Sequence, residues 1–196
     1  MRECHYMKSG CSVHELVEVL ISAIEAKDNY TKGHSERVAE MTSDICSHLI
    51  LSKSEVDEIH VAAHLHDLGK IYVEDAVLKK AGKLTEDEWE QIKMHPQVGE
   101  NILSKVSGFG DIIKMVRHHH ERWDGRGYPD GISGENIPLG ARIITVADAI
   151  DAMLSERPYR PPMTLENCLI ELEAGKNKQF DPMIADIAMR ILAERV

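Results

Sequence analysis

The 196-residue chain is predicted to be all-α, and three observations carry this prediction. Apolar residues recur at steps of three and four along most of the chain, the spacing that gives a helix one buried face. Aromatic residues make up only 5% of the chain, which favours aliphatic helix packing over a β-sandwich. No segment of any length alternates apolar and polar residues as a half-buried strand would. We therefore expect a compact bundle of about seven helices.

Capping signals mark the ends of these helices. Ser12, Ser52 and Thr85 are each followed three residues later by glutamate, a capping box that opens a helix. Gly69 suits a helix end, and Pro96 suits the first turn of the next helix. The segments with helical character are residues 12–27, 34–49, 53–68, 86–95, 96–106, 110–121, 141–155 and 182–196.

Composition and charge argue against several classes of protein. The formal net charge of -10 argues against a polyanion such as duplex DNA as a partner. The four cysteines form no CxxC pair, which favours reduced thiols. Residues 1–11 lack the apolar core of a signal peptide, and no stretch approaches the roughly 18 apolar residues of a membrane span. We expect a cytoplasmic protein with one domain over residues 12–196, preceded by a poorly ordered segment, residues 1–11.

A long loop is predicted at residues 123–140, "WDGRGYPDGISGENIPLG", which holds five glycines and two prolines in 18 residues. Loops longer than about 12–15 residues inside a compact domain usually have a function. This loop follows three consecutive histidines, so a functional site is expected nearby.

Histidines and aspartates share helical stripes with aliphatic residues. The adjacent His66 and Asp67 illustrate the problem, because burying a carboxylate beside an imidazole costs free energy unless both are paired. Metal ions would use the polarity of each such side chain in coordination. Seven donors exceed what one tetrahedral ion needs, so two ions bridged by Asp67 and a hydroxide are the economical arrangement. The inward-facing donors are His34, His66, Asp67, His95, His119, His120 and Asp148.

At these residues the sequence resembles the HD-GYP family, a branch of the HD metal-dependent phosphohydrolases. The motifs that carry the resemblance are "HLHDLGK", "MHPQVG", "HHERWDGRGYP", "ITVADAIDAM", "RPYR" and "QFDP", and they run in order through nearly the whole chain. The resemblance implies a compact helical bundle of the HD-domain type. It also implies hydrolysis of cyclic di-GMP by a metal-bridging hydroxide, giving linear pGpG and, in some members, GMP.

The resemblance also assigns roles to individual residues. The seven donors named above become metal ligands, and Lys70 becomes the lysine beside the scissile phosphate. Asp151 is expected either to contact the attacking water or Lys70, or to form a structural pair. The expected catalytic residues are thus Lys70, Asp67 and Asp151. The expected substrate contacts are Arg126, Gly127, Tyr128 and Pro129 in the glycine-rich loop, with Arg157 and Arg160 of "RPYR".

One departure from the family bears on the number of metals. Some relatives hold three ions and supply a glutamate one turn before the first histidine, where this chain has Tyr30. Phenol is a poor ligand at neutral pH, so we expect two divalent ions per site, and the resemblance implies that they are iron or manganese. His64 and His118 match no family ligand and are expected to lie behind the ligands or to be partly exposed.

Three functional hypotheses remain open from the sequence. The first is an active cyclic di-GMP phosphodiesterase. The second is a binding module that senses the messenger but turns it over poorly. The third is a phosphodiesterase for another cyclic dinucleotide, such as cyclic GMP-AMP. The resemblance also implies that the glycine-rich loop is a docking surface for diguanylate cyclase (GGDEF) domains, and a homodimer is the expected assembly.

Overall fold

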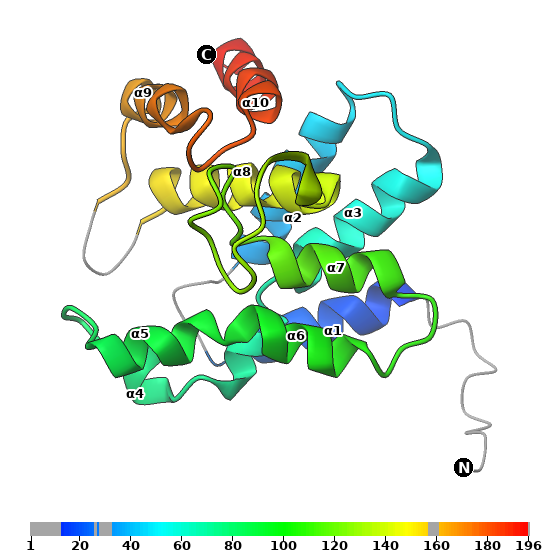
Figure 1. Ribbon diagram of the computed structural model, residues 1–196, viewed down its shortest axis with the longest axis vertical. Helices are drawn as coiled ribbons and strands as arrows, with labels where there is room; N and C mark the ends of the chain where they lie inside the picture. The colour runs from blue at the N-terminus through cyan, green and yellow to red at the C-terminus, as the bar shows by residue number, and fades with distance from the viewer. Residues whose placement is uncertain (1–12, 26, 28–32, 157–160, 196) are drawn as a thin grey trace.

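The computed structural model of this chain describes residues 13–25, 27, 33–156 and 161–195 (Figure 1). The predicted disordered segment, residues 1–11, therefore lies outside the described residues, as do Tyr30, Arg157 and Arg160.

The described residues form helices, and the all-α prediction is confirmed. An isolated bridge pairs Lys176 with Phe180 in the turn before the last helix. The elements are α1 (Val13–Glu25), α2 (His34–Cys46), α3 (Lys53–Leu65), the 3₁₀ helix η2 (Leu68–Tyr72), α4 (Asp75–Leu78), α5 (Glu86–Lys93), α6 (His95–Leu103), α7 (Gly110–His118), the 3₁₀ helix η3 (Gly134–Asn136), α8 (Leu139–Leu154), α9 (Leu165–Gly175) and α10 (Pro182–Glu194).

Two of the predicted capping boxes are present. Ser52 accepts a hydrogen bond from the backbone N–H of Glu55 at the start of α3, and the Glu55 carboxylate accepts one in return from Ser52. Thr85 and Glu88 form the same reciprocal pair at the start of α5. These bonds satisfy backbone N–H groups that the first turn of a helix leaves without partners.

Helix α9 was not among the predicted elements. Its N-cap is Thr164, whose side chain accepts from the backbone N–H of Asn167. Only Cys168 and Leu172 of this helix are buried, because α9 lies on the outside of the bundle. In the sequence, a capping residue followed by two apolar residues four positions apart indicates a helix only weakly.

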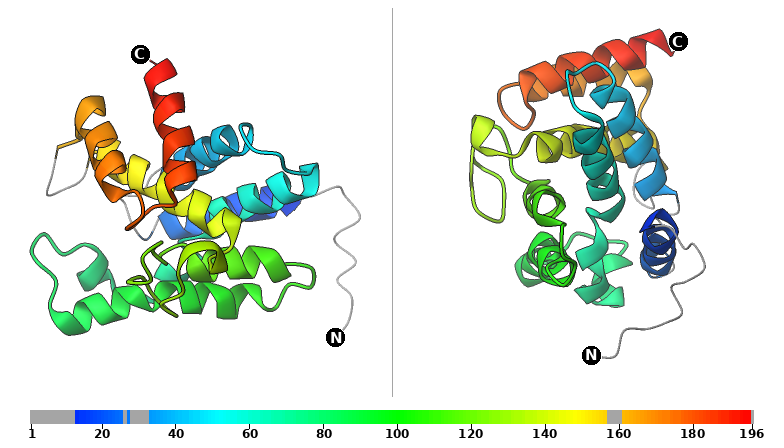
Figure 2. Two further views of the ribbon diagram at one scale, coloured as in Figure 1. Left: turned by 45° about the horizontal axis from the view of Figure 1, so that its top comes forward. Right: turned by 90° about the vertical axis from the view of Figure 1, so that its right-hand side faces the viewer.

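Helix α8 is the centre of the core. It contacts α2, α3, α7, α9 and α10, and both views in Figure 2 place α9 and α10 on one side of it and α6 and α7 on the other. Ala141, Ile143, Ile144, Val146 and Ala147 of α8 are completely buried. A helix that is apolar on nearly all sides must be enclosed by others, and Asp148 and Asp151 are therefore carried into the interior.

A close approach between η2 and α6 brings two motifs together. A Cβ atom on Gly69 would lie 1.8 Å from the carbonyl oxygen of His95 and 2.7 Å from the backbone nitrogen of Gly99. Only glycine permits this contact, because every other residue carries a Cβ. The contact sets Asp67 and Lys70, at the start of η2, beside His95 at the start of α6.

Among the helices described here, none combines the length and apolar character that a membrane span requires.

Candidate metal centre

The seven predicted donors converge on one place in the fold. They come from the first residue of α2, the residues after α3, the first residue of α6, the residues after α7, and the middle of α8. All except two are fully buried, and those two, His120 and Asp148, are partly buried. The donors are His34, His66, Asp67, His95, His119, His120 and Asp148.

Asp67 lies between two groups of donors. Its Oδ2 is 3.6 Å from His34 Nε2 and 3.5 Å from His66 Nε2, while its Oδ1 is 3.5 Å from His95 Nε2. Donor atoms bound at about 2.1 Å to one ion lie roughly 3.0–3.4 Å apart. The two oxygens of Asp67 therefore face two separate sets of nitrogen atoms at nearly ligand-to-ligand spacing.

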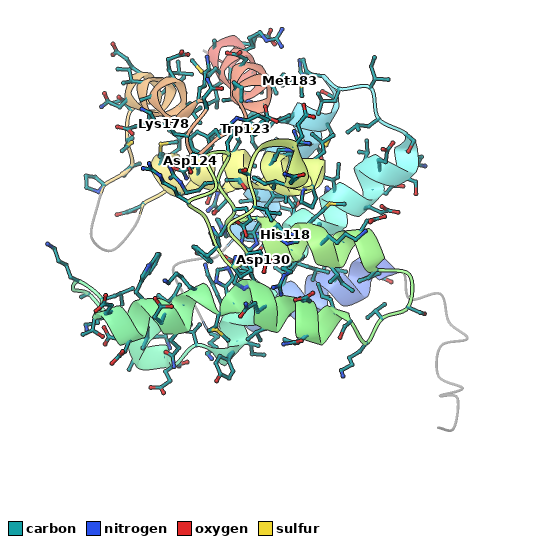
Figure 3. All side chains as sticks on the ribbon, viewed as in Figure 1. His118, Trp123, Asp124, Asp130, Lys178 and Met183 are labelled. Atoms are coloured by element: carbon teal, nitrogen blue, oxygen red, sulfur yellow. The ribbon has the colours of Figure 1, made fainter. Side chains whose placement is uncertain are left out.

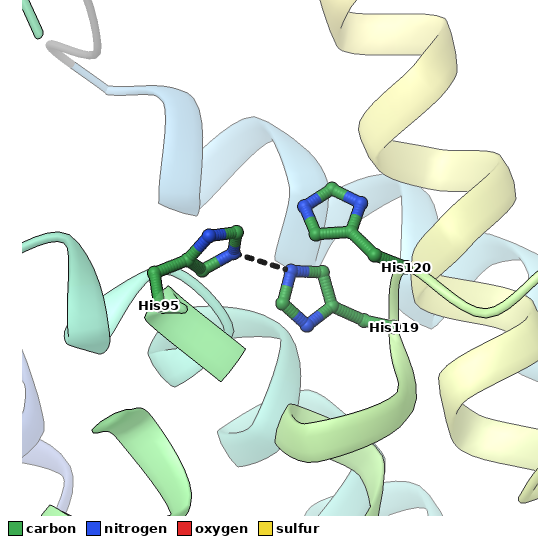
Figure 4. Close-up of side chains that lie close together, drawn as sticks. All are labelled: His95, His119 and His120. Atoms are coloured by element: carbon green, nitrogen blue, oxygen red, sulfur yellow. Dashed lines mark hydrogen bonds between the residues drawn. The ribbon is translucent and has the colours of Figure 1, made fainter. Parts of the chain in front are cut away.

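The first group contains His34, His66 and Asp148. Its Nε2 atoms, on His34 and His66, lie 3.4 Å apart, and His34 Nε2 is 3.5 Å from Asp148 Oδ1. The second group contains His95, His119 and His120 (Figure 4). The Nε2 atoms of His95 and His119 are 3.2 Å apart. Each group gathers its three donor atoms within 4.8 Å, which is compact enough for one cation.

Backbone carbonyls orient three of the imidazoles. The Nδ1 atoms of His66, His95 and His119 donate to the carbonyl three residues earlier, at distances of 2.6, 2.8 and 2.7 Å. A carbonyl can only accept, so each Nδ1 carries a proton, and Nε2 is the atom of each ring that faces the centre and is left to bind a cation. Such partners behind the ligands are typical of metal-binding histidines.

Asp151 orients the fourth imidazole. His34 Nδ1 lies 2.7 Å from Asp151 Oδ2, and the other oxygen of Asp151 accepts from Arg37 Nε at 2.5 Å and from Ser155 Oγ at 3.0 Å. These contacts give Asp151 a structural role behind His34. A contact of Asp151 with the attacking water or with Lys70 stays a prediction.

The charges of these groups suit cation binding. Burial strongly lowers the pKa of His95, to about 3, and also lowers the pKa values of His119 and His120 well below the usual value, so all three are neutral at pH 7. Burial alone would raise the pKa of Asp67, but the nearby Lys70 and His66 outweigh it and hold that pKa well below its usual value. Neutral imidazoles and an ionised carboxylate are the protonation states that bind metals.

His34 differs from the other imidazoles. Burial lowers its pKa, but the hydrogen bonds with Asp151 and Asp67 outweigh burial and raise the pKa to about 9. Without a cation, this ring would therefore hold a proton beside three carboxylates, those of Asp67, Asp148 and Asp151. A cation bound at Nε2 would replace that proton and supply the missing positive charge.

Lys70 stands at the edge of the centre. Its Nζ is 2.6 Å from Asp67 Oδ2 and its side chain is 22% exposed, so the ammonium group can be reached from the cavity beside the centre. That cavity measures about 470 Å³, within the range of small-molecule sites. A second hollow, of about 720 Å³, lies on the other side of Asp148 and His120 and is lined by Arg122, Met153 and Lys178 among others.

The glycine-rich loop is anchored from inside by Glu121, which the sequence analysis did not single out. This side chain is 1% exposed, and its Oε1 accepts from the backbone N–H groups of Asp130 at 2.7 Å and Gly131 at 3.0 Å. A glutamate directly after three histidines was visible in the sequence, but its partners nine and ten residues away were not.

Within this loop, Tyr128 faces the centre. Its ring stacks on His120, with centroids 4.9 Å apart and planes inclined by 29°, and it lines the 470 Å³ cavity. The Tyr128–Pro129 peptide bond is cis, and Gly127 packs so closely on the chain before it that a Cβ there would lie 2.4 Å from the backbone nitrogen of Arg122. Arg126 is exposed, and its backbone N–H donates to Asp124. The substrate contacts expected from Arg126, Gly127, Tyr128 and Pro129 stay predictions.

Two histidines outside the donor set have other partners. His118 Nε2 lies 2.9 Å from Asp130 Oδ2, which ties the end of α7 to the glycine-rich loop (Figure 3). His64 is buried, and its Nε2 is 3.1 Å from His60 Nε2.

The glycine-rich loop also contacts the turn before α10. Figure 3 shows Asp124 near Lys178, whose backbone carbonyl accepts a hydrogen bond from the Asp124 N–H at 2.8 Å.

Comparison with known proteins gives a consistent family. A family model described as an HD domain matches residues 18–184. The chain is 44% identical over 180 residues to the cyclic di-GMP phosphodiesterase response regulator RpfG of Xanthomonas campestris, covering 90% of this chain and 47% of that protein. It is 39% identical over 184 residues to a cyclic di-GMP phosphodiesterase of Thermotoga maritima, covering 92% of this chain and 50% of that protein.

Other relatives bear a different substrate in their names. The chain is 44% identical over 159 residues to the 3'3'-cGAMP-specific phosphodiesterase 3 of Vibrio cholerae, covering 81% of this chain and 35% of that protein. A solved structure of a V. cholerae cyclic GMP-AMP specific phosphodiesterase, V-cGAP3, superposes with a TM-score of 0.69 at 21% identity, over 91% of this chain and 49% of that one. This structural likeness shows the fold. The chain spans half or less of the length of these curated relatives.

Proposed function

Because the chain belongs to the HD domain family, and because the resemblance to the HD-GYP branch is confirmed by its relatives, we propose that it is a metal-dependent phosphodiesterase that hydrolyses cyclic di-GMP to linear pGpG. The observation that carries this proposal is the position of Asp67, whose two oxygens face two groups of buried imidazole and carboxylate donors. The proposed domain is residues 12–196.

The donor set fits two divalent cations. His34, His66 and Asp148 would hold one, His95, His119 and His120 the other, and Asp67 would serve both. Mixed imidazole and carboxylate ligands suit iron or manganese, the proposed ions. When bound, such ions supply Lewis acidity toward water and toward phosphodiester oxygens.

The protein's own residues would position the substrate and neutralise its charge. A phosphodiester placed in the 470 Å³ cavity would meet the ammonium group of Lys70 directly beside the donor cluster. Lys70 would stabilise the negative charge that develops on the phosphoryl oxygens and could donate a proton to the departing 3′ oxygen. Asp151 would hold His34 in its orientation through the 2.7 Å hydrogen bond. The complete donor set together with Lys70 favours an enzyme over a binding module.

A second substrate deserves the same test. The relatives at 44% identity include one named for cyclic di-GMP and one named for 3'3'-cGAMP. Hydrolysis of 3'3'-cGAMP is therefore the second candidate function. Both reactions would use the same donor cluster and Lys70.

The test is purification without oxygen, metal analysis, and chromatography of cyclic di-GMP and 3'3'-cGAMP digests. We expect two iron or manganese ions per chain and the appearance of a linear dinucleotide. Joint replacement of His66 and Asp67 by Ala should abolish both metal binding and turnover. Replacement of the exposed His48 by Ala should change neither. Turnover that survives the loss of His66 and Asp67 would overturn the proposal.

The remaining predictions concern surroundings rather than chemistry. We propose GGDEF domains as partners of the glycine-rich loop, a homodimer as the assembly, and the cytoplasm as the location. Size-exclusion chromatography with light scattering would test the assembly, and pull-down with a purified GGDEF domain would test the partner.

A further inference from the structure

The cavity beside the donor cluster has two chemically different parts. Its floor is formed by the cluster and Lys70, whereas its outer wall is largely apolar. Leu78 at the end of α4, Leu84 in the connection before α5, and Trp89 and Ile92 of α5 line that wall, and Lys80 adds one charged side chain to it. Figure 1 shows α4 and α5 extending at the lower left, beyond the helices packed around α8. A phosphate suits the floor, and an apolar or aromatic group suits the wall.

Trp89 is the residue of this wall whose exposure calls for an explanation. Trp89 is 45% exposed, although burying an aromatic side chain of this size is strongly favourable. The capping box formed by Thr85 and Glu88 fixes the first turn of α5, so the indole stands on a rigid element. Exposed aromatic surface inside a cavity is typical of a ligand site.

Two ring contacts connect Trp89 to the donor cluster. The indole meets the Tyr128 ring edge-to-face, with centroids 6.4 Å apart and an interplanar angle of 78°. Tyr128 in turn stacks on His120 at 4.9 Å. Support of Tyr128 explains one side of the indole, but Trp89 lines the cavity and stays 45% exposed.

We infer that Trp89 forms a nucleobase subsite, on which one purine base of the substrate stacks while the attached phosphate reaches Lys70 and the donor cluster. The inference rests on the proposed function. A base is joined to its phosphate through a single ribose, so the base of a bound phosphodiester must lie on a wall next to the floor. Trp89 offers the one exposed indole among the described residues that line this cavity.

The inference also predicts what Trp89 does not do. Stacking on an aromatic ring tolerates every base, because each base has a π-face. Trp89 therefore supplies affinity without choosing between guanine and adenine. Removal of the indole should weaken the binding of cyclic di-GMP and of 3'3'-cGAMP by similar factors.

Steady-state kinetics of the metal-loaded enzyme test the role of the indole. Trp89→Leu should raise KM about tenfold, the effect of losing one stacked base. Because the indole does not touch the reacting atoms, kcat should stay within about twofold of wild type. Trp89→Phe keeps an aromatic face and should restore most of the affinity. Ile102→Ala, which alters an exposed apolar residue of α6 outside the cavity, should change neither constant.

Fluorescence gives a second readout that does not depend on turnover. The chain has two tryptophans, so Trp123→Phe leaves Trp89 as the reporter. Titration of the metal-loaded Trp123→Phe protein with GMP, which has no diester to cut, should quench its emission with saturation. The same titration of Trp89→Phe, in which only Trp123 emits, should produce no comparable quenching.

The possible results separate this inference from the proposed function. If the wild type cleaves cyclic dinucleotides but Trp89→Leu leaves KM within twofold and GMP quenches nothing, the subsite is wrong and the phosphodiesterase stands. A fall in kcat or in metal content with KM unchanged would show that the indole only supports Tyr128, and would also overturn the inference. If GMP quenches Trp89 in a protein that cleaves no cyclic dinucleotide, the subsite stands and the proposed activity fails.

Discussion

The carboxylate of Asp151 lies 2.7 Å from Nδ1 of His34, on the side of the imidazole that faces away from the other donors. Asp151 is held in turn by the guanidinium of Arg37 and the hydroxyl of Ser155. Loss of such a partner behind a metal ligand typically lowers metal affinity about 10–100-fold. We expect this loss for Asp151→Asn, which keeps the shape of the side chain but removes its charge. Competition with a fluorescent chelator would measure it.

Ser155→Ala is the matched control for this variant, because it removes one hydrogen bond to Asp151 and leaves the pair with His34 intact. Its metal affinity should stay within about threefold of wild type. An unchanged affinity in Asp151→Asn would show that Asp151 does not tune the site.

Lys70→Met should separate chemistry from metal binding. The methionine keeps an unbranched chain of similar length but loses the ammonium group 2.6 Å from Asp67 Oδ2. Removing one group that stabilises charge in a transition state costs about 10²–10³ in kcat, and we expect a loss of this size. Metal content should remain at the wild-type level, as measured by elemental analysis. A variant that loses its metal together with activity would instead assign Lys70 to the stability of the centre.

Gly69→Ala should disrupt the centre through the backbone. The new Cβ would lie 1.8 Å from the His95 carbonyl oxygen, so η2 and α6 must separate. We expect a loss of more than about 3 kcal/mol in the free energy of unfolding, or failure to fold, because overpacking at a backbone contact cannot be relieved by a side-chain rotation. Urea denaturation would measure the loss. Gly82→Ala is the control, because a Cβ there meets nothing within 4 Å.

The metal-free protein should lose stability on both sides of neutral pH. The pKa of His95 is lowered to about 3, and those of His119 and His120 are also lowered. In the unfolded chain these histidines have a pKa of about 6.5. Below this pH the unfolded state therefore binds more protons than the folded state, and the free energy of unfolding falls as the pH falls. The pKa of His34 is raised to about 9, so its contribution is complete below about 6.5 and is lost as the pH rises through 9.

Thermal unfolding of the metal-free protein from pH 5 to pH 10 would measure this dependence. The melting temperature should change more steeply with pH on the acid side, because three imidazoles gain protons on unfolding there, whereas only one loses a proton on the alkaline side. Addition of manganese should raise the melting temperature more at pH 7 and above than at pH 5, because protons compete less for the nitrogen atoms as the pH rises. A melting temperature that does not change between pH 5 and pH 7 would contradict these shifted pKa values.

The sequence predicted which histidines and aspartates gather in the interior, because helical periodicity reports burial. His34 and His66 share stripes with aliphatic residues, and a histidine on such a stripe must point inward. The family motifs then placed the remaining donors. The sequence could not predict which donors group around each oxygen of Asp67, because this grouping depends on contacts between segments far apart in the chain.

Other features escaped for the same reason. Arg37 and Trp89 read as ordinary surface residues of amphipathic helices, and only the packing of α8 and the glycine-rich loop against them reveals their partners. Glu121 holds backbone groups rather than side chains, so no pairing of residue types could point to it. The short helix α4 and the outer helix α9 bury little apolar surface, and weak burial gives a weak pattern.

The donors of the centre stand at positions 34 and 148 and at five places between them, each at or near an end of a helix except Asp148. Cations held by all of them would act as further cross-links between segments that are otherwise joined by packing and a few hydrogen bonds, such as the one between His34 and Asp151. A chelator should therefore loosen the whole bundle and make its interhelical connections accessible to proteases, well beyond the loss of a reaction. Iron or manganese supply in the cell would then set how much of this protein persists as well as how much of it works.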